Sequence, residues 1–263
     1  MTYDLDAPVV RRRCATALAA HPARGRFVAL AVGPADPLAD VARTVERQAL
    51  GHDATALAFE NSPYESQSLF LLVLDRDTGL PAGAGRVVEG GGRALDDAPA
   101  RIGRDLSAIV DAHGLHDGGK IWDLATLVVL DDDAGPLLHR TLLQAGHRAG
   151  VRHVVALLDD RTHRDLTLLG VPFTALAGAE PAQRAVYVSF AEVEPAIVAQ
   201  ARRLSRPVGP FAGEIRARGL RRLLTRRTAA RVCDQVATGA GLNEHIQMPG
   251  LERRRYRSLK TKR

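Results

Sequence analysis

The sequence predicts an α+β protein built around one mixed β-sheet. Apolar residues make up 46% and charged residues 25% of the 263 residues, which are the proportions of an ordinary globular chain. Short apolar runs of strand type alternate with segments whose apolar residues recur at helical spacing. Two of the apolar runs are joined by a tight turn, as in a β-hairpin, so the sheet cannot be purely parallel.

The first third of the chain predicts helix, strand and helix. Residues 9–20 have helical spacing and end before Pro22, which interrupts a helix. Residues 26–32 are a strand-like apolar run that Gly33 and Pro34 close. Residues 37–50 predict a second helix, because their leucines and valines recur every three or four positions.

A hairpin follows. Residues 69–74 are apolar on both faces, as in a central strand. Residues 75–79 form a turn, and residues 81–89 return as the second strand, with Arg86 on the face shared by Ala82, Ala84 and Val88. After Gly90–Gly92 the pattern alternates between helices and strands. Helices are predicted at 102–112, 137–149 and 162–169, and strands at 121–130, 151–158 and 185–190.

Composition excludes several functional classes. No apolar run is long enough to cross a bilayer, and the N-terminus lacks the apolar core of a secretory signal. Cys14 and Cys233 are too far apart in sequence to suggest a disulfide framework or a zinc site. The nine histidines lack metal-ligand spacing, and neither a serine-hydrolase elbow nor a Walker loop is present. We therefore expect a cytoplasmic protein with no metal.

Charge is distributed unevenly along the chain. Residues 195–263 carry 17 Lys and Arg against 4 Asp and Glu, whereas residues 1–194 carry 19 against 26. We therefore divide the chain into a domain at 1–194 and a basic helical extension with a tail at 195–263. Within the extension, residues 212–237 predict an amphipathic helix or helix pair that packs through Ile215, Leu220, Leu223 and Leu224. Its arginines favour an anionic partner.

The order of these elements resembles the GCN5-related N-acetyltransferase (GNAT) superfamily over residues 26–192. The pieces that carry the resemblance are LFLLVLDRDTGLPAGAGRVV, WDLATLVVL, the helix at 137–149, VRHVVALLDD and THRDLTLLGVPF. Arg86 in the hairpin and Asp123 in the following strand are most similar to acyl-homoserine-lactone synthases and N-acyl amino acid synthases. The resemblance implies a central sheet whose fourth and fifth strands splay apart.

The resemblance also implies transfer of an acyl group from a thioester to the amine of a small, amino-acid-like acceptor. The donor would be acyl-CoA or an acyl carrier protein, with no tightly bound cofactor. Its pantetheine arm would lie between the splayed strands, against the backbone of Leu127, Val128, Val129 and Leu130. A plain buried strand would give the same sequence there.

One segment departs from the superfamily pattern. The superfamily binds the pyrophosphate of coenzyme A at a glycine-rich helix start, whereas this chain has Asp-Asp-Asp-Ala-Gly-Pro at residues 131–136. Asp133 is the predicted N-cap, Pro136 removes a donor, and three carboxylates repel phosphate. Either the donor lacks the pyrophosphate contact, as an acyl carrier protein does, or the fold has lost catalysis.

Two residues are the principal candidates for chemistry. Asp123 opens its strand, where a carboxylate can take a proton from the attacking amine; it replaces the Glu of the family. Arg86, in a strand of small residues, can hold a substrate carboxylate with two hydrogen bonds. The alternatives are a strand-end ion pair for Asp123 and a solvent-facing side chain for Arg86.

Further candidates lie nearby. Glu60, Tyr64 and Ser66 precede the hairpin, where a polar loop can border the acceptor site and Tyr64 can protonate the leaving thiolate. Trp122 is assigned to an acyl pocket or to the core. The competing function is a non-catalytic GNAT-like protein whose arginine-rich tail contacts nucleic acid. The missing pyrophosphate loop favours that alternative, whereas Asp123 with Arg86 favours the enzyme.

Overall fold

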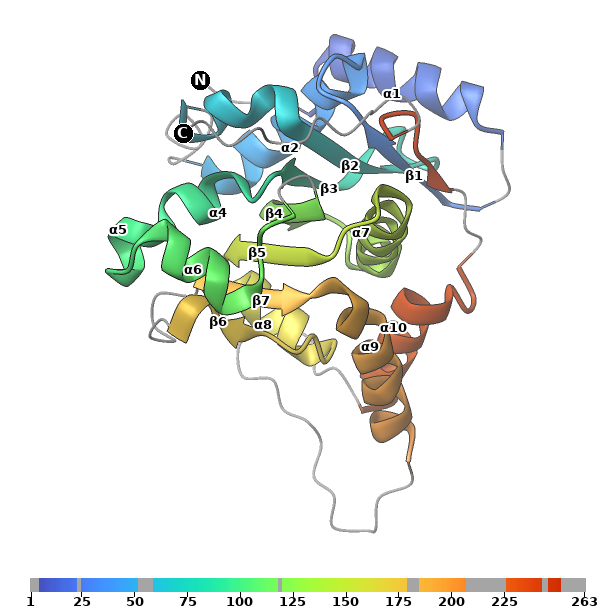
Figure 1. Ribbon diagram of the computed structural model, residues 1–263. Coiled ribbons are helices and arrows are strands. Elements are labelled where there is room, and N and C mark those ends of the chain that lie inside the picture. The colour runs from blue at the N-terminus through green and yellow to red at the C-terminus, as the bar shows by residue number, and fades with distance from the viewer. Residues whose placement is uncertain are drawn as a thin grey trace.

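The computed structural model describes residues 5–22, 25–51, 59–117, 120–178, 185–206, 226–242 and 246–251. Within them the strands form one open sheet in the order β6-β7-β5-β4-β3-β2-β1-β8, with parallel and antiparallel pairs. Helices lie against both faces of this sheet (Figure 1). The predicted α+β class with a mixed sheet is confirmed.

The helices and strands predicted between residues 9 and 190 are present, with shifts at their ends. Of the helix or helix pair predicted at 212–237, the structure describes only residues 226–237, which are helical. The strands are β1 (Phe27–Val32), β2 (Ser68–Asp75), β3 (Leu80–Glu89), β4 (Ile121–Val129), β5 (His153–Leu157), β6 (Thr174–Ala175), β7 (Ala185–Ser189) and β8 (Ile246–Gln247). The α-helices are α1 (Pro8–Ala20), α2 (Pro37–Leu50), α4 (Gly92–Asp96), α5 (Ala98–Ile102), α6 (Leu106–His113), α7 (Gly135–Ala149), α8 (Asp160–Leu168), α9 (Phe190–Ser205) and α10 (Arg226–Thr238). Three short 3-10 helices are η2 (Ser62–Gln67), η4 (Asp132–Ala134) and η5 (Leu176–Gly178).

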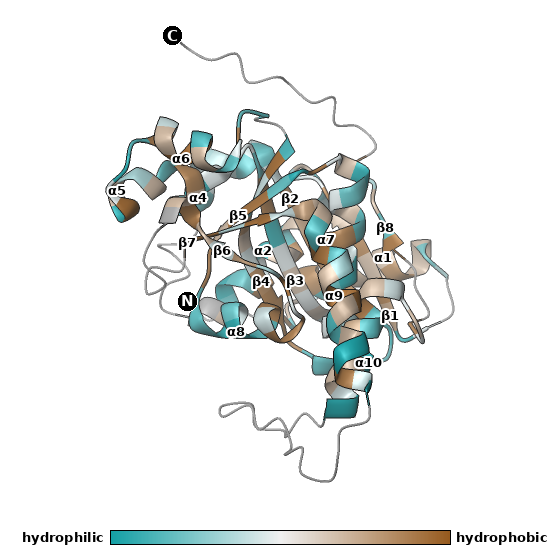
Figure 2. Ribbon diagram, turned by 60° about the horizontal axis from the view of Figure 1, so that its bottom comes forward, coloured by the Kyte–Doolittle hydropathy of each residue, from teal (hydrophilic) through white to brown (hydrophobic). Residues whose placement is uncertain are grey.

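Burial on both faces explains the apolar strands at the centre. All eight residues of β2 are buried. On one face Phe70 and Leu72 pack with α1 and α2, and on the other Leu69 and Leu71 pack in the larger cluster that contains α7, α9 and α10. In Figure 2 the strands at the centre are mainly hydrophobic, whereas α8 and the outer side of α10 are largely hydrophilic.

Two bulges set which side chains share a face. The register between β2 and β3 shifts beside Val73, so that Ala82 packs in the larger cluster while Ala84 packs with α1 and α2. The predicted common face of Ala82 and Ala84 is therefore wrong, because a bulge reverses the alternation of side chains. A second shift, between β3 and β4, leaves Ala125 without a partner in β3.

The sheet splays between β4 and β5, as expected. The two strands pair in parallel only from Ile121 to Asp123 against His153 to Val155. Beyond Asp123, β4 continues along β3 as far as Val129, whereas its ladder with β5 has ended. The backbone of β4 from Leu124 onward is thus available on its β5 side.

The C-terminal segment returns to the body of the protein. The proposed boundary between residues 194 and 195 falls inside α9, which contains Pro195; the division into two domains stays a prediction. Helix α10 packs against α7 and α9, and Arg140 of α7 donates to the carbonyl of Ala237 over 2.8 Å. Strand β8 pairs with β1. The predicted packing residues Ile215, Leu220, Leu223 and Leu224 lie outside the described residues. Among the helices that are described, none has the length and apolarity to cross a membrane.

Candidate active site

A pocket of about 210 Å³ lies where β4 and β5 part. One end is polar and is formed by Asn61, Arg93 and Asp123. The remaining wall comes from β4, from the end of β5 and from the start of α8, and comprises Leu124, Ala125, Thr126, Leu127, Val128, Leu157, Leu158, Asp159 and Thr162. The leucines and Val128 of this wall form an apolar side of the pocket, next to the part of β4 that has no partner strand on its β5 side among the described residues.

Asp123 is the buried carboxylate of this pocket. Its side chain is 2% exposed, and its Oδ2 atom accepts a hydrogen bond from the backbone N–H of Ala94 over 3.0 Å. Burial raises the pKa of Asp123 to about 7, although the backbone N–H groups of Ala94 and Arg93 oppose the rise. A carboxyl group with this pKa exchanges protons readily at neutral pH, as a general base must.

The bulge at Ala125 places Thr126 on the same face as Asp123. Asp123 pairs with Val88, and Thr126 pairs with Arg86, which lies two residues from Val88 on the same face of β3. The hydroxyl of Thr126 donates to Glu46 of α2. Asp123 and Arg86 thus lie on the same face of the sheet, which is necessary if both are to contact one acceptor.

The guanidinium of Arg86, however, is bound by carboxylates of the protein itself. Its Nη2 and Nε atoms donate to both oxygens of Glu46, over 2.7 and 3.2 Å, and its Nη1 atom donates to Glu65 over 3.3 Å. Arg86 and Glu46 are 4% and 2% exposed. Arg86 does not line the pocket. Its predicted contact with a substrate carboxylate stays a prediction that would have to displace these bonds.

The loop candidates take different positions. The Tyr64 hydroxyl donates to Asp96 over 2.5 Å, and burial together with that carboxylate raises the pKa of Tyr64, which makes it a weaker acid. Glu60 accepts a hydrogen bond from Arg93. Ser66 is exposed on η2. None of the three lines the pocket. Their proposed roles toward substrate stay predictions.

Trp122 lies in the core, and only part of the strand segment predicted to bind the thioester donor, Leu127–Leu130, lines the pocket. Trp122 is fully buried in the larger core cluster, on the face opposite Asp123, and is absent from the pocket wall. Leu127 and Val128 line the pocket, whereas Val129 and Leu130 do not. The backbone N–H of Leu130 donates to Ala82 over 2.9 Å.

The acidic loop after β4 is held by one arginine. Arg26 donates to Asp75 over 2.9 Å and to Asp131 over 2.7 Å, and it lies 3.6 Å from Asp133. Asp131, whose side chain accepts from the backbone N–H of Asp133, caps η4. The prediction that Asp133 is the N-cap is therefore wrong, because a turn of 3-10 helix precedes α7 and shifts the cap by two residues. The carboxylates thus lie between the end of β4 and the start of α7.

Sequence reasoning missed Asn61 and Arg93. Asn61 is 2% exposed and its Nδ2 atom has no hydrogen-bond partner among the residues described. Arg93 donates through Nη1 to Glu60 and through Nε to Asp97 over 3.0 Å. Asn61 lies in the polar loop before the hairpin, and Arg93 directly follows Gly90–Gly92, but neither residue is part of a recognisable motif. In the described part of the chain, no group of three or more His, Cys, Asp or Glu residues is arranged to hold a metal ion.

No protein-family model matches the sequence, and no curated protein matches it either. Several solved structures are similar to the chain. A CoA-dependent acyl-homoserine lactone synthase, BjaI, in complex with SAM and isopentyl-CoA, is 14% identical with a TM-score of 0.41, and the match covers 69% of this chain and 91% of that one. TofI, in a ternary complex with an inhibitor and MTA, is 12% identical with a TM-score of 0.45, covering 65% and 96%.

An N-acyl amino acid synthase from uncultured soil microbes, FeeM, is 14% identical with a TM-score of 0.43, and the match covers 66% of this chain and 96% of that one. The protein classes that the sequence pattern resembles are thus found among these structures. Likenesses of this strength carry no chemical statement, so the function has to be argued from the residues of this chain.

Proposed function

We propose that the protein is an N-acyltransferase that moves an acyl group from a thioester donor to the amine of a small, amino-acid-like acceptor. One observation carries the proposal. A buried carboxylate with a pKa of about 7, Asp123, lines a pocket and is the last residue of β4 that pairs with β5 before the two strands separate.

The splay supports the binding of a thioester arm. After Asp123, no strand among the described residues pairs with the β5 side of β4, so that N–H and C=O groups on this side can pair with the amides of a pantetheine arm. Leu127 and Val128 border this slot, and Leu157 and Leu158 form its other side. An N–H of β4 directed at the thioester carbonyl would stabilise the negative oxygen that forms during attack.

Asp123 supplies the base. The amine reaches the active site mainly as an ammonium ion, and the ionised Asp123 carboxylate takes one of its protons, directly or through water. The free amine then attacks the thioester carbonyl; a C–N bond forms, the C–S bond breaks, and the sulfur leaves as a thiolate. Before the C–S bond breaks, the second proton of the attacking nitrogen passes to water. The thiolate then takes up a proton from solvent, and Asp123 releases its proton to solvent, which restores the carboxylate.

The donor is proposed to bind without a strong pyrophosphate contact. Asp131 and Asp133 directly precede α7 and both lie beside Arg26, and Pro136 in the first turn of α7 removes a backbone donor. Arg26 is the cation of this loop, and its charge is already shared among Asp75, Asp131 and Asp133. This arrangement favours a donor recognised through its pantetheine arm, such as an acyl carrier protein, and tolerates acyl-CoA.

The test is a matrix of donors and acceptors with product detection by mass spectrometry. Acyl-pantetheine, acyl-CoA and acylated carrier protein are each incubated with a panel of primary amines and the full-length protein. N-acylated products that form with the wild type and are lost with Asp123→Asn support the proposal. Hydrolysis alone, or products of equal yield from both proteins, would refute it.

A further inference from the structure

The polar end of the pocket contains a hydrogen-bond donor that the protein does not use. Asn61 follows directly after Glu60 and is 98% removed from solvent, with 2% of its surface exposed. Its Nδ2 atom finds no acceptor within the described chain, yet the residue lines the pocket. A buried amide without a partner costs free energy, and such groups are normally satisfied. An oxygen atom of a ligand in this pocket would satisfy it.

The electrostatic surroundings of Asn61 restrict the charge of that ligand. Arg93 is the cation of the pocket wall, but it is paired with both Glu60 and Asp97. Two further carboxylates, Asp123 and Asp159, line the pocket themselves. Among the described residues that line the pocket or pair with Arg93, carboxyl groups therefore outnumber the guanidinium, which favours an ammonium group and disfavours a further negative charge.

From these two observations, and on the basis of the proposed N-acyl transfer, we propose that the acceptor is a cationic primary amine bearing a neutral oxygen that accepts from Asn61. A carbonyl of an amide or ester, or a hydroxyl, has this chemistry. A free amino acid places a carboxylate in the same position and is a poorer fit. Asn61 is accordingly a specificity-determining residue, and Asp123 receives the proton from the same ligand.

Arg86 does not provide an alternative carboxylate site in this arrangement. Its guanidinium is bound by Glu46 and Glu65 and lies outside the pocket wall. An acceptor carboxylate would thus meet Asp123 and Asp159, and Arg93, the arginine among the described residues that line the pocket, is already paired with Glu60 and Asp97. The expected preference for an acceptor without a carboxylate therefore follows from the pairing of Arg86 and Arg93 with carboxylates of the protein.

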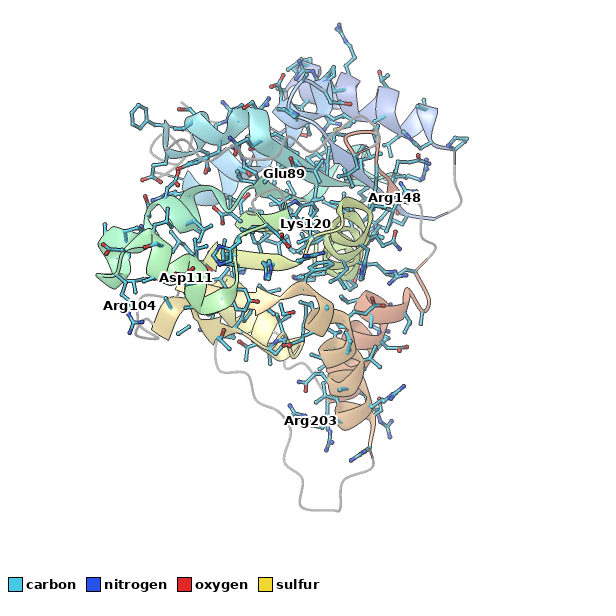
Figure 3. The ribbon with its side chains drawn as sticks, viewed as in Figure 1. Glu89, Arg104, Asp111, Lys120, Arg148 and Arg203 are labelled. Carbon is cyan, nitrogen blue, oxygen red and sulfur yellow. The ribbon has the colours of Figure 1, made fainter. Side chains whose placement is uncertain are left out.

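The experiment compares matched ligands on matched variants. The amines are an amino acid, its amide, its amino alcohol, and the alkylamine that has the same side chain but lacks the oxygen. The proteins are the wild type, Asn61→Asp, Asn61→Leu and, as a surface control, Arg104→Gln, whose side chain points outward beside α5 and α6 (Figure 3). Each pair is measured by kcat/KM for acylation and by the shift of the melting temperature that the amine produces without a donor.

We expect the wild type to prefer the amide over the free amino acid by about tenfold or more in kcat/KM, as one hydrogen bond and one avoided repulsion allow. Asn61→Leu and Asn61→Asp should remove the advantage of the amide over the alkylamine, whereas Arg104→Gln should retain it. A preference for the free amino acid would overturn the inference. An equal loss with every amine would also overturn it, because Asn61 would then act on the donor.

The melting measurement separates this inference from the proposed function. If no product forms with any amine, the proposed acyl transfer fails, but the amide should still raise the melting temperature of the wild type more than that of Asn61→Leu. If products form and the amide stabilises both proteins equally, acyl transfer stands and the role of Asn61 is refuted.

Discussion

Replacing Asp123 by Asn should alter the pH dependence of stability in a direction that the burial of this carboxyl dictates. The pKa of Asp123 is about 7 in the folded protein and 3.8 in an unperturbed chain. Above pH 4 the unfolded chain gives up this proton first, so the wild type loses stability as pH rises, until the folded carboxyl ionises near pH 7. Asn carries no such proton, and the variant lacks this loss.

The size of the effect follows from the two pKa values. At 1.36 kcal/mol per pKa unit, the whole displacement corresponds to about 4 kcal/mol. Between pH 5 and pH 8, the part that remains to be lost is about 2–3 kcal/mol. The measured quantity is the difference in free energy of unfolding between Asp123→Asn and the wild type, compared at two pH values. Effects of the substitution that do not depend on pH, such as an altered hydrogen bond to Ala94, cancel in this comparison.

Urea unfolding at pH 5, 6, 7 and 8 measures this difference. Trp122 is the sole tryptophan and is fully buried, so its emission reports the unfolding of the core. The free energy of unfolding of Asp123→Asn, relative to that of the wild type, should increase from pH 5 to about pH 7 and then level off toward pH 8. Asp105→Asn, at an exposed position, controls for the loss of one negative charge. Parallel pH curves for the wild type and Asp123→Asn would refute the raised pKa, and with it the assignment of Asp123 as a base near neutral pH.

Three further predictions follow from the same region. Arg86→Met should lower the free energy of unfolding by about 3–5 kcal/mol, because Glu46 is left as an uncompensated buried charge. Adding Glu46→Gln should recover part of this loss in urea unfolding. A loss below about 1 kcal/mol would contradict the buried pair. Gly92→Ala should lower the free energy of unfolding more than Gly103→Ala. Both glycines have a positive φ, but only a Cβ atom added at Gly92 would lie 2.9 Å from Asp123 Oδ2. Equal losses in urea unfolding would contradict this contact. Acyl-pantetheine and acyl-CoA should differ by less than about tenfold in kcat/KM, because the start of α7 is acidic; a preference of 100-fold or more for acyl-CoA would show that its pyrophosphate is bound.

The hairpin and the helix of α7 could be predicted from the sequence because their signals are local. The continuous apolar run of β2 and the helical spacing of residues 137–149 are both patterns among neighbouring residues. The splay between β4 and β5 followed from the resemblance in the order of elements, which the structure bears out. Asp123 was identified for the same reason, since it opens a strand whose limits were clear.

Other features depended on partners far along the chain. The boundary proposed at Pro195 was drawn where composition changes, but α9 runs through it from Phe190 to Ser205. Strand β8 has only two residues, and its pairing with β1 spans more than 200 positions of sequence. The bulges beside Val73 and at Ala125 reversed the facing of side chains, which an alternation rule applied along one strand does not reveal.

Periodicity and turn chemistry act over a few neighbouring residues, so the fold class, the order of the central elements and the acidic residue near the start of β4 could all be predicted from the chain. The charges that are available to a ligand could not, because they depend on tertiary packing. Glu46 lies 40 positions from Arg86 and neutralises it, whereas Glu60 and Asp97 neutralise Arg93. Desolvation and pairing depend on what surrounds a group in space, and that surrounding is assembled only when distant segments pack together.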